Sequence, residues 1–196
     1  MAYEPKPLKF DMKSLEGISS KTLETHWGKL YQGYVKKYNE IQEKLESVNQ
    51  AEANASQSEW RDLQQGETFT CDGIILHELY FDNLGGKGLP RGLEVGRAII
   101  DQFGSMDGFK GVLTASGMGA RGWVVLAVNP LDAKLHCYAC DAHNQGGIWG
   151  AIPILVLDVY EHAYFIDYGS DRKGYIEAFW KNIDWDMVNK RFLSAV

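Results

Sequence analysis

Four side chains with the chemistry of metal ligands lie far apart in this sequence, each within an apolar or aromatic segment: His26, His77, Asp158 and His162. An unpartnered imidazole or an ionised carboxylate buried in such a segment would be strongly unfavourable. A shared metal ion removes this cost, because it gives all four groups a partner. Three imidazoles and one carboxylate suit Fe or Mn better than Ca or Mg, which prefer oxygen ligands. The sequence therefore predicts a fold in which four distant segments converge on one transition-metal ion.

The first half of the chain has the periodicity of two helices. From Ser19 to about Asn49, apolar residues recur every three or four positions, with Ser19 or Ser20 as N-cap and His26, Leu30 and Tyr34 on one stripe. Residues 49–58 are polar and are expected to form a solvated connection. The second predicted helix, 67–83, is apolar nearly all round, which is typical of a buried helix.

The second half of the chain has a mixed pattern. The glycine-rich residues 85–90 indicate a domain boundary. Helical patterns at 93–103 and 106–115 precede short β-rich runs at 123–128, 134–141 and 152–159, and residues 160–192 return to helices. We therefore expect an α+β fold, in which an N-terminal helical hairpin domain (1–88) packs on a C-terminal α/β domain (89–196) with a small three-stranded antiparallel sheet.

Composition excludes several classes of protein. The 196 residues are 45% hydrophobic, which is enough for a substantial core. We find neither a secretory signal at the N-terminus nor an apolar run of the roughly 20 residues that a membrane span needs. The three cysteines are too few for a disulfide framework, which fits a reducing compartment. The net charge of −6 argues against nucleic-acid binding. These features predict a soluble, cytoplasmic protein with no nucleic-acid or membrane partner.

Five stretches of the chain resemble the iron/manganese superoxide dismutase family, and the resemblance runs from about Pro7 to Phe192. They are 24–35 (ETHWGKLYQGYV), 77–84 (HELYFDNL), 121–126 (RGWVVL), 158–164 (DVYEHAY) and 175–185 (YIEAFWKNIDW). The resemblance implies that His26, His77, Asp158 and His162 hold one Mn or Fe ion per subunit. It also implies that the protein converts superoxide to dioxygen and hydrogen peroxide.

The resemblance also assigns two catalytic side chains. Tyr34 matches the family's gateway tyrosine, which passes protons, and Gln145 resembles the glutamine that hydrogen-bonds the metal-bound water. In the family's manganese branch this glutamine faces a glycine on the second helix, and Gly73 stands at that position here. The pair Gly73 and Gln145 therefore favours the manganese-like arrangement. An Asn-Gln-Gly-Gly turn with no functional role is the alternative.

Further positions take their expected roles from the same resemblance. Trp123, Tyr160 and Trp180 would wall the cavity with apolar surface. Lys29 and Arg172 match basic positions near the family's substrate funnel, where they would attract superoxide in spite of the negative net charge. Glu161 resembles the glutamate that hydrogen-bonds a ligand histidine of the partner subunit. That contact implies a homodimer joined through Glu161 and His162, with a tetramer as the alternative.

Three departures from the family pattern motivate a second hypothesis. Leu30 and Phe165 stand where the family usually has a hydrogen-bonded histidine and tyrosine, and Tyr160 stands where a tryptophan is usual. Because both members of the hydrogen bond are apolar here, neither leaves a buried polar group unpaired. The alternative function is a metal-binding paralogue with little dismutase activity.

Two other interpretations come from different classes. His136, Cys137, Cys140 and His143 have the spacing of a zinc site, but the segment reads as a strand, in which residues three apart face opposite sides. A helical interaction module with incidental histidines is the remaining possibility. It predicts purified protein that contains no stoichiometric transition metal.

Overall fold

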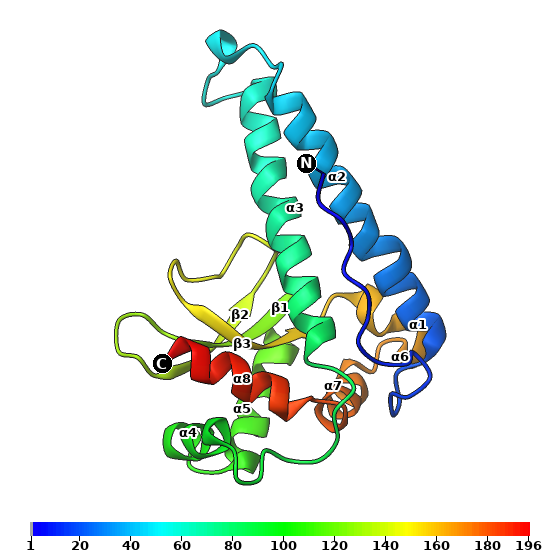
Figure 1. Cartoon of the computed structure of the whole chain (residues 1–196), viewed down its shortest axis with the longest axis vertical. Helices are drawn as coiled ribbons and strands as arrows, with labels where there is room; N and C mark the ends of the chain where they lie inside the picture. Colours follow the sequence, from blue (N-terminus) through cyan, green and yellow to red (C-terminus); the bar gives the residue numbers. More distant parts are fainter. Residues whose placement is uncertain (1) are drawn as a thin grey trace.

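The computed structural model describes residues 2–196. Its N-terminal part is a helical hairpin. One arm consists of α1 (Ser20–Thr25), the π-helical segment η1 (His26–Tyr31) and α2 (Gln32–Leu45), and the other arm is α3 (Glu59–Asp82). The two arms lie side by side along the length of the molecule (Figure 1). Between them, the predicted polar connection contains only the short 3-10 helix η2 (Gln50–Glu52).

The second arm is longer than the sequence pattern predicted. It begins at Glu59 rather than at about residue 67. The Ser58 hydroxyl accepts a hydrogen bond from the Arg61 amide at 3.3 Å, and two acidic residues in the first turn, Glu59 and Asp62, face the positive end of the helix dipole. The prediction considered apolar residues only and therefore missed this polar first turn.

The first arm is not one regular helix. Residues His26–Tyr31 form a π-helical turn, a feature that is frequent at functional sites. In a π-helix the residue five positions on, not four, returns to the same face. Tyr31 is accordingly buried, at 1% exposure, whereas Leu30 is half-exposed. The predicted stripe of His26, Leu30 and Tyr34 is thus wrong at its middle position.

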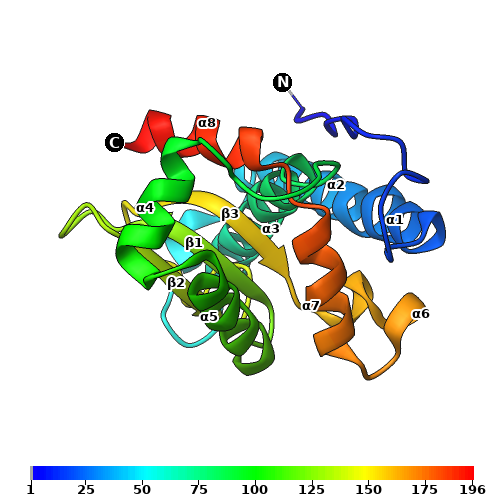
Figure 2. The ribbon, with the colours of Figure 1, turned by 90° about the horizontal axis from the view of Figure 1, so that it is seen from below.

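The C-terminal part is built on a three-stranded antiparallel sheet, as predicted. Its strands are β1 (Trp123–Val128), β2 (Leu135–Cys140) and β3 (Ile152–Asp158), in the order β2-β1-β3, and the central strand β1 is buried throughout. Helices α4 (Glu94–Phe103) and α5 (Met106–Gly119) lie on one side of the sheet and the hairpin lies on the other (Figure 2).

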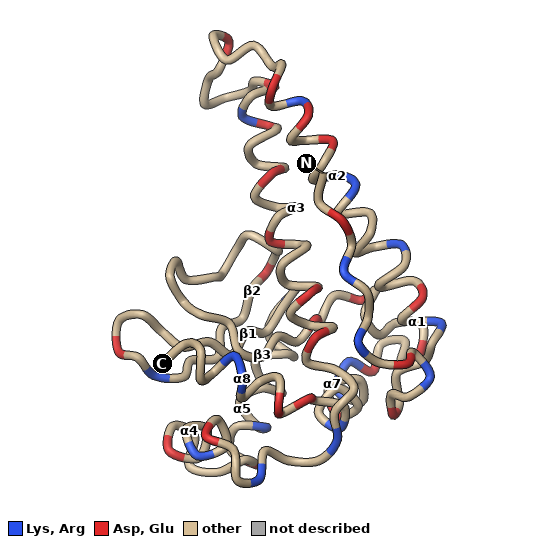
Figure 3. The backbone as a smooth tube through the Cα atoms, viewed as in Figure 1, with Lys and Arg blue, Asp and Glu red and all other residues tan. Residues whose placement is uncertain are grey.

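The chain ends in short helices that close the molecule around the sheet. These are η3 (Glu161–Ala163), α6 (Phe165–Tyr168), α7 (Arg172–Lys181) and α8 (Trp185–Ala195). Of the acidic and basic residues, whose positions along the backbone are coloured in Figure 3, the three strands contain only Asp158. A single carboxylate is therefore buried at the end of an otherwise uncharged sheet.

Within residues 2–196, no helix has the length and apolarity that crossing a bilayer requires.

Candidate metal centre

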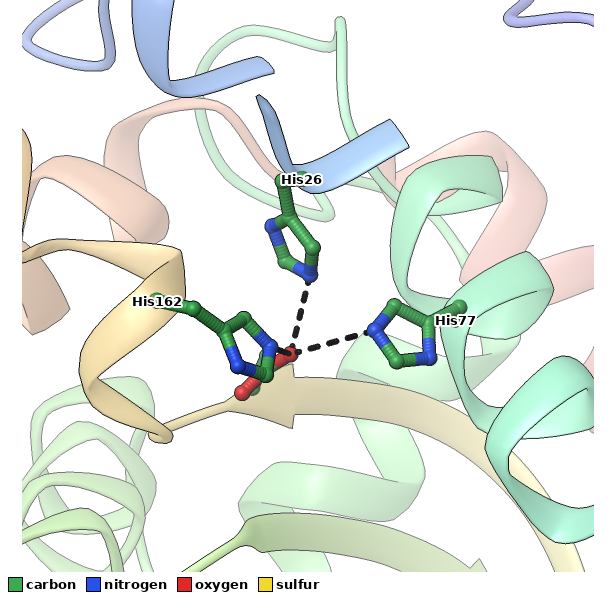
Figure 4. A group of neighbouring side chains, drawn as sticks. His26, His77 and His162 are labelled. Carbon is green, nitrogen blue, oxygen red and sulfur yellow. Dashed lines mark hydrogen bonds and ion pairs between the residues drawn. The ribbon is translucent and has the colours of Figure 1, made fainter. Parts of the chain in front are cut away.

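The four predicted ligands converge from four different elements. His26 begins η1, His77 lies in α3, Asp158 ends β3 and His162 lies in η3. One ligand atom from each side chain lies within 4.8 Å of the other three. Asp158 Oδ2 is 3.0 Å from His26 Nε2, 3.8 Å from His77 Nε2 and 3.1 Å from His162 Nε2. Figure 4 shows the three imidazoles pointing toward this one carboxylate oxygen.

Three buried nitrogen atoms at this centre lack hydrogen-bond partners in the protein. His26 and His77 are fully buried, and neither ring nitrogen of His26 nor Nε2 of His77 forms a hydrogen bond. The close approach of His26 to Asp158 does not have hydrogen-bonding geometry. Buried donors and acceptors are normally satisfied, and leaving one unpaired costs about 1–3 kcal/mol. A cation coordinated by these nitrogens would supply the missing partner.

Neighbouring backbone groups orient two of the ligands. His77 Nδ1 lies 2.6 Å from the Gly73 carbonyl oxygen, which can only accept, so Nδ1 carries the proton and donates it. Nε2 of His77 therefore presents its lone pair to the centre, as a metal ligand must. The Tyr160 amide donates to Asp158 Oδ1 at 2.9 Å and leaves Oδ2 to face the histidines.

The electrostatics of His26, His77 and Asp158 favour the protonation states that bind a metal. Burial lowers the pKa of His26, and it lowers the pKa of His77 to about 3. Burial alone would raise the pKa of Asp158, but the adjacent His162 and His26 imidazoles together outweigh this effect and the pKa falls. Burial likewise opposes protonation of His162, yet the Asp158 carboxylate raises the pKa of this ring. Neutral imidazoles and an ionised carboxylate are the states that coordination needs.

Three buried nitrogen donors and one carboxylate oxygen fit a transition metal such as Mn or Fe. A calcium or magnesium ion would need six or more oxygen ligands, and the cluster offers oxygen only from Asp158. Among residues 2–196, this is the only cluster of three or more His, Cys, Asp or Glu side chains with the geometry of a metal site.

The space next to Gly73 is filled by His143, not by the predicted Gln145. A Cβ atom on Gly73 would lie 3.3 Å from His143 Cδ2 and 3.2 Å from Tyr34 Cδ1. His143 is buried at 5% exposure, whereas the Gln145 side chain is exposed. The placement of Gln145 is therefore corrected. The two residues lie two positions apart in one loop, and the loop's turn, bridged between Ala142 and Gln145, directs the histidine inward.

His143 joins two aromatic side chains of the site by hydrogen bonds. Trp123 Nε1 donates to His143 Nδ1 at 2.9 Å, and His143 Nε2 lies 2.7 Å from the Tyr34 hydroxyl. Since an indole N–H can only donate, Nδ1 must accept and the neutral ring carries its proton on Nε2. His143 Nε2 therefore donates to the Tyr34 oxygen. An imidazole, like an amide, can donate and accept at once, and this property of His143 was the available sequence signal.

Two of the three expected wall residues border the ligands. Trp123 makes an edge-to-face contact with His77 at 5.0 Å between ring centroids, and Tyr160 stacks on His162 at 5.3 Å. Trp180 instead packs against Phe109 and Trp185, so its predicted place at the cavity is wrong. Five residues along α7 from the buried Tyr175, its side chain is rotated by about 140° to another face.

The charged residues near the centre have different surroundings. The Arg172 guanidinium donates to the Tyr164 hydroxyl at 3.1 Å and to the Ala120 carbonyl at 2.8 Å, so it ties α7 to the end of α5. Lys29 and Glu161 are exposed on the described chain. The attraction of superoxide by Lys29 and the contact of Glu161 with a partner subunit stay predictions.

The alternative zinc site does not assemble. His143 is engaged with Trp123 and Tyr34, and His136 pairs with Asp132 at 3.0 Å on the surface. Burial raises the pKa of both Cys137 and Cys140 to about 11, which disfavours the thiolates that zinc requires. The Cys-x-x-Cys spacing belongs to the ordinary packing of β2.

A buried set of three histidines and one aspartate between a helical hairpin and an α/β part defines a protein for a single transition-metal ion. Comparison with known families specifies the protein family. Residues 2–85 match the α-hairpin domain of the iron/manganese superoxide dismutases, and residues 90–191 match the C-terminal domain. The chain belongs to the iron/manganese superoxide dismutase family.

Individual relatives extend over nearly the whole chain. The chain is 46% identical to "Superoxide dismutase [Fe]" of Aquifex pyrophilus, over 94% of this chain and 88% of the relative. It is 36% identical to "Superoxide dismutase [Mn] 2" of Haloferax volcanii, over 100% and 98%. It is 34% identical to "Superoxide dismutase [Mn/Fe]" of Aeropyrum pernix, over 99% and 92%. The relatives thus include iron, manganese and mixed-metal proteins.

Proposed function

We propose that this protein is a superoxide dismutase that converts superoxide to dioxygen and hydrogen peroxide at one Mn or Fe ion. The observation that carries the proposal is the convergence of His26, His77, Asp158 and His162, with unpaired buried nitrogens, in a chain of this family. When bound, the ion supplies a one-electron couple that takes an electron from one superoxide and gives it to the next.

The protein's own residues supply protons for the reduction. Burial lowers the pKa of His143 to about 4 and raises the pKa of Tyr34 to about 12, so both are neutral near pH 7. Because His143 Nε2–H donates to the Tyr34 oxygen, the Tyr34 hydroxyl hydrogen is free to point elsewhere. We assign Tyr34 as the residue that passes a proton to the reduced substrate and His143 as the residue that holds the phenol in place.

The metal is Mn or Fe, one ion per subunit, with the manganese-like arrangement favoured. One support is Gly73, which leaves room beside the centre. The other is His143, which fills this room from the loop after β2, as the glutamine of the manganese branch does. The side chain itself departs from that branch, because the imidazole of His143 stands where the amide of Gln145 was expected.

A homodimer is the assembly we propose. The face next to His162 exposes Glu161 together with two large apolar side chains, Phe165 at 56% and Ile166 at 43%. His162 is the one ligand whose side chain is partly open, at 23%. A second subunit docked on this face would cover the apolar residues and bring its glutamate to the ligand. A tetramer and a cytoplasmic location stay predictions.

The alternative is a metal-binding paralogue with little activity, motivated by Leu30, Phe165 and Tyr160. Protein produced with Mn and Fe both supplied should contain one ion per chain and dismute superoxide in at least one metal form. Full metal content with negligible dismutation would favour the paralogue.

Ligand substitutions test the site directly. We expect His77→Ala and Asp158→Ala to lose both bound metal and dismutase activity, because each removes a buried ligand. His136→Ala, which removes a surface histidine outside the centre, is the matched control and should keep both. Dismutase activity that survives either ligand substitution refutes the assignment.

A further inference from the structure

Asn83 connects the two elements that carry His77 and Asp158. It caps the C-terminus of α3 and is fully buried. Its Oδ1 accepts from the Val156 amide at 3.0 Å, and its Nδ2 donates to the Val156 carbonyl at 3.1 Å and to the Tyr80 carbonyl at 2.8 Å. One side-chain amide thus binds both backbone groups of a single residue in β3.

This contact fills part of a free sheet edge. In the order β2-β1-β3, the outer edge of β3 has no neighbouring strand. Backbone groups at a buried edge need other partners. The Asn83 amide provides them at Val156 and does what one residue of an adjacent strand would do.

Arg191 of α8 holds the same junction from a third side. Its Nη1 donates to Asn83 Oδ1 at 3.2 Å and to the Ile154 carbonyl at 3.4 Å, and its Nη2 donates to the Leu79 carbonyl at 3.1 Å. A planar guanidinium has the geometry to make such simultaneous contacts. Helix α3, strand β3 and helix α8 therefore meet at one connected set of hydrogen bonds.

The junction lies close to the ligands along both elements. Val156 precedes Asp158 by two residues in β3, and Asn83 follows His77 by six residues at the end of α3. Both elements are hydrogen-bonded, so fixing their junction fixes the distance between their ligand atoms, 3.8 Å from His77 Nε2 to Asp158 Oδ2. We propose that Asn83, held by Arg191, is a positioning residue that sets the spacing of His77 and Asp158 and so the affinity for the metal. The inference rests on the metal site of the proposed function.

The chain contains a matched control for this role. Asn182 caps the C-terminus of α7 and is also buried, at 3% exposure. Its Oδ1 accepts from the Glu16 amide at 2.9 Å, and its Nδ2 donates to the Glu16 and Ala178 carbonyls, both at 2.8 Å. This pattern matches that of Asn83 except for the additional contact of Asn83 with Arg191. It joins α7 to the N-terminal segment, and neither of these carries a ligand.

The experiment compares Asn83→Ala with Asn182→Ala. The free energy of unfolding of the metal-free proteins should fall in both variants, because Asn83→Ala loses four side-chain hydrogen bonds and Asn182→Ala loses three. Chelator competition should show Mn or Fe affinity reduced on the order of 10-fold to 100-fold in Asn83→Ala only, the range for residues that orient ligands. The visible absorption of the trivalent metal form should shift in the same variant.

A second substitution keeps the test decisive if Asn83→Ala does not fold. Asn83→Asp preserves the shape and the acceptor for Val156, but it places an oxygen against the Val156 and Tyr80 carbonyls. It should weaken metal affinity in the same direction. Metal affinity and absorption that match the Asn182 control in every folded Asn83 variant overturn the inference. Wild-type protein that binds no metal would instead overturn the proposed function.

Discussion

At the scale of single residues, the centre depends on which buried polar atoms find partners. Trp123 is fully buried, and the only partner of its indole N–H among the described residues is His143 Nδ1. Gln145 points away from this position. His143 thus satisfies a buried donor of the sheet and a phenol of the hairpin at the same time, which links stability to the proposed proton path.

The first prediction concerns this pair. His143→Ala should cost about 1–3 kcal/mol, because it leaves Trp123 Nε1 buried without an acceptor. Trp123→Phe removes the donor, so the double variant has no buried N–H without an acceptor and does not pay that cost. Urea unfolding of the four metal-free proteins should give a coupling energy of about 1 kcal/mol. Additive losses would show that the hydrogen bond between the two rings does not stabilise the fold.

At the scale of elements, two glycines of helix α3 allow neighbouring side chains to approach it closely. Gly66 faces Ile41 of α2, with 3.1 Å from a built Cβ atom to Cδ1, and Gly73 faces Tyr34 and His143. The π-helical turn adds to this arrangement, since it places both His26 and Tyr31 on the face toward α3. The hairpin therefore presents two ligands to the centre, His26 and His77, with the rings of Tyr31 and Tyr34 beside His77.

The second prediction contrasts two glycines of the hairpin. Gly33→Ala in α2 should raise stability by about 0.5–1 kcal/mol, because its Cβ would meet no atom within 4 Å and alanine favours a helix. Gly73→Ala should instead cost about 1–3 kcal/mol by overpacking and displace the Tyr34 and His143 rings. Urea unfolding measures both effects.

The imidazole signals of His143 in an NMR spectrum test whether Gly73→Ala displaces this ring. They should shift in Gly73→Ala and stay unchanged in Gly33→Ala. If Gly73→Ala proves as stable as wild type with unchanged His143 signals, the packing described around Gly73 is wrong.

At the scale of the whole molecule, the buried histidines make the metal-free protein sensitive to acid. The folded-state pKa values of His77 and His143, about 3 and about 4, lie below the ordinary histidine value of about 6.5, and that of His26 is also lowered. The unfolded chain therefore binds more protons, and stability is lost as pH falls below 6.5. Asp158 adds a loss of the same sign at lower pH, whereas His162, with a raised pKa, opposes it.

The third prediction follows from the balance of three histidines with lowered pKa values against one histidine with a raised pKa. The free energy of unfolding of the metal-free protein should fall between pH 6.5 and pH 4. His143→Gln should flatten this dependence. Chemical denaturation at several pH values measures the slope. A stability that rises on acidification would contradict the neutral state of the buried rings.

The sequence by itself determined the elements and the ligand set. Apolar periodicity and turn residues predicted the hairpin and the strands, and a carboxylate after an apolar strand, together with three histidines in apolar segments, predicted the metal centre. Five matching stretches indicated the family. These features are local or depend on residue type, so they can be read without knowing which segments meet.

Only the tertiary structure decided what surrounds the ligands. The π-helical turn replaced Leu30 by Tyr31 on the buried face, the loop after β2 brought in His143 rather than Gln145, and α7 turned Trp180 away from the cavity. Each outcome depends on the local rotation of a helix or the course of a loop, which apolar periodicity does not resolve. The Asn83 junction is of the same kind, because a hydrogen bond between residues 73 positions apart exists only once helix and sheet are packed together.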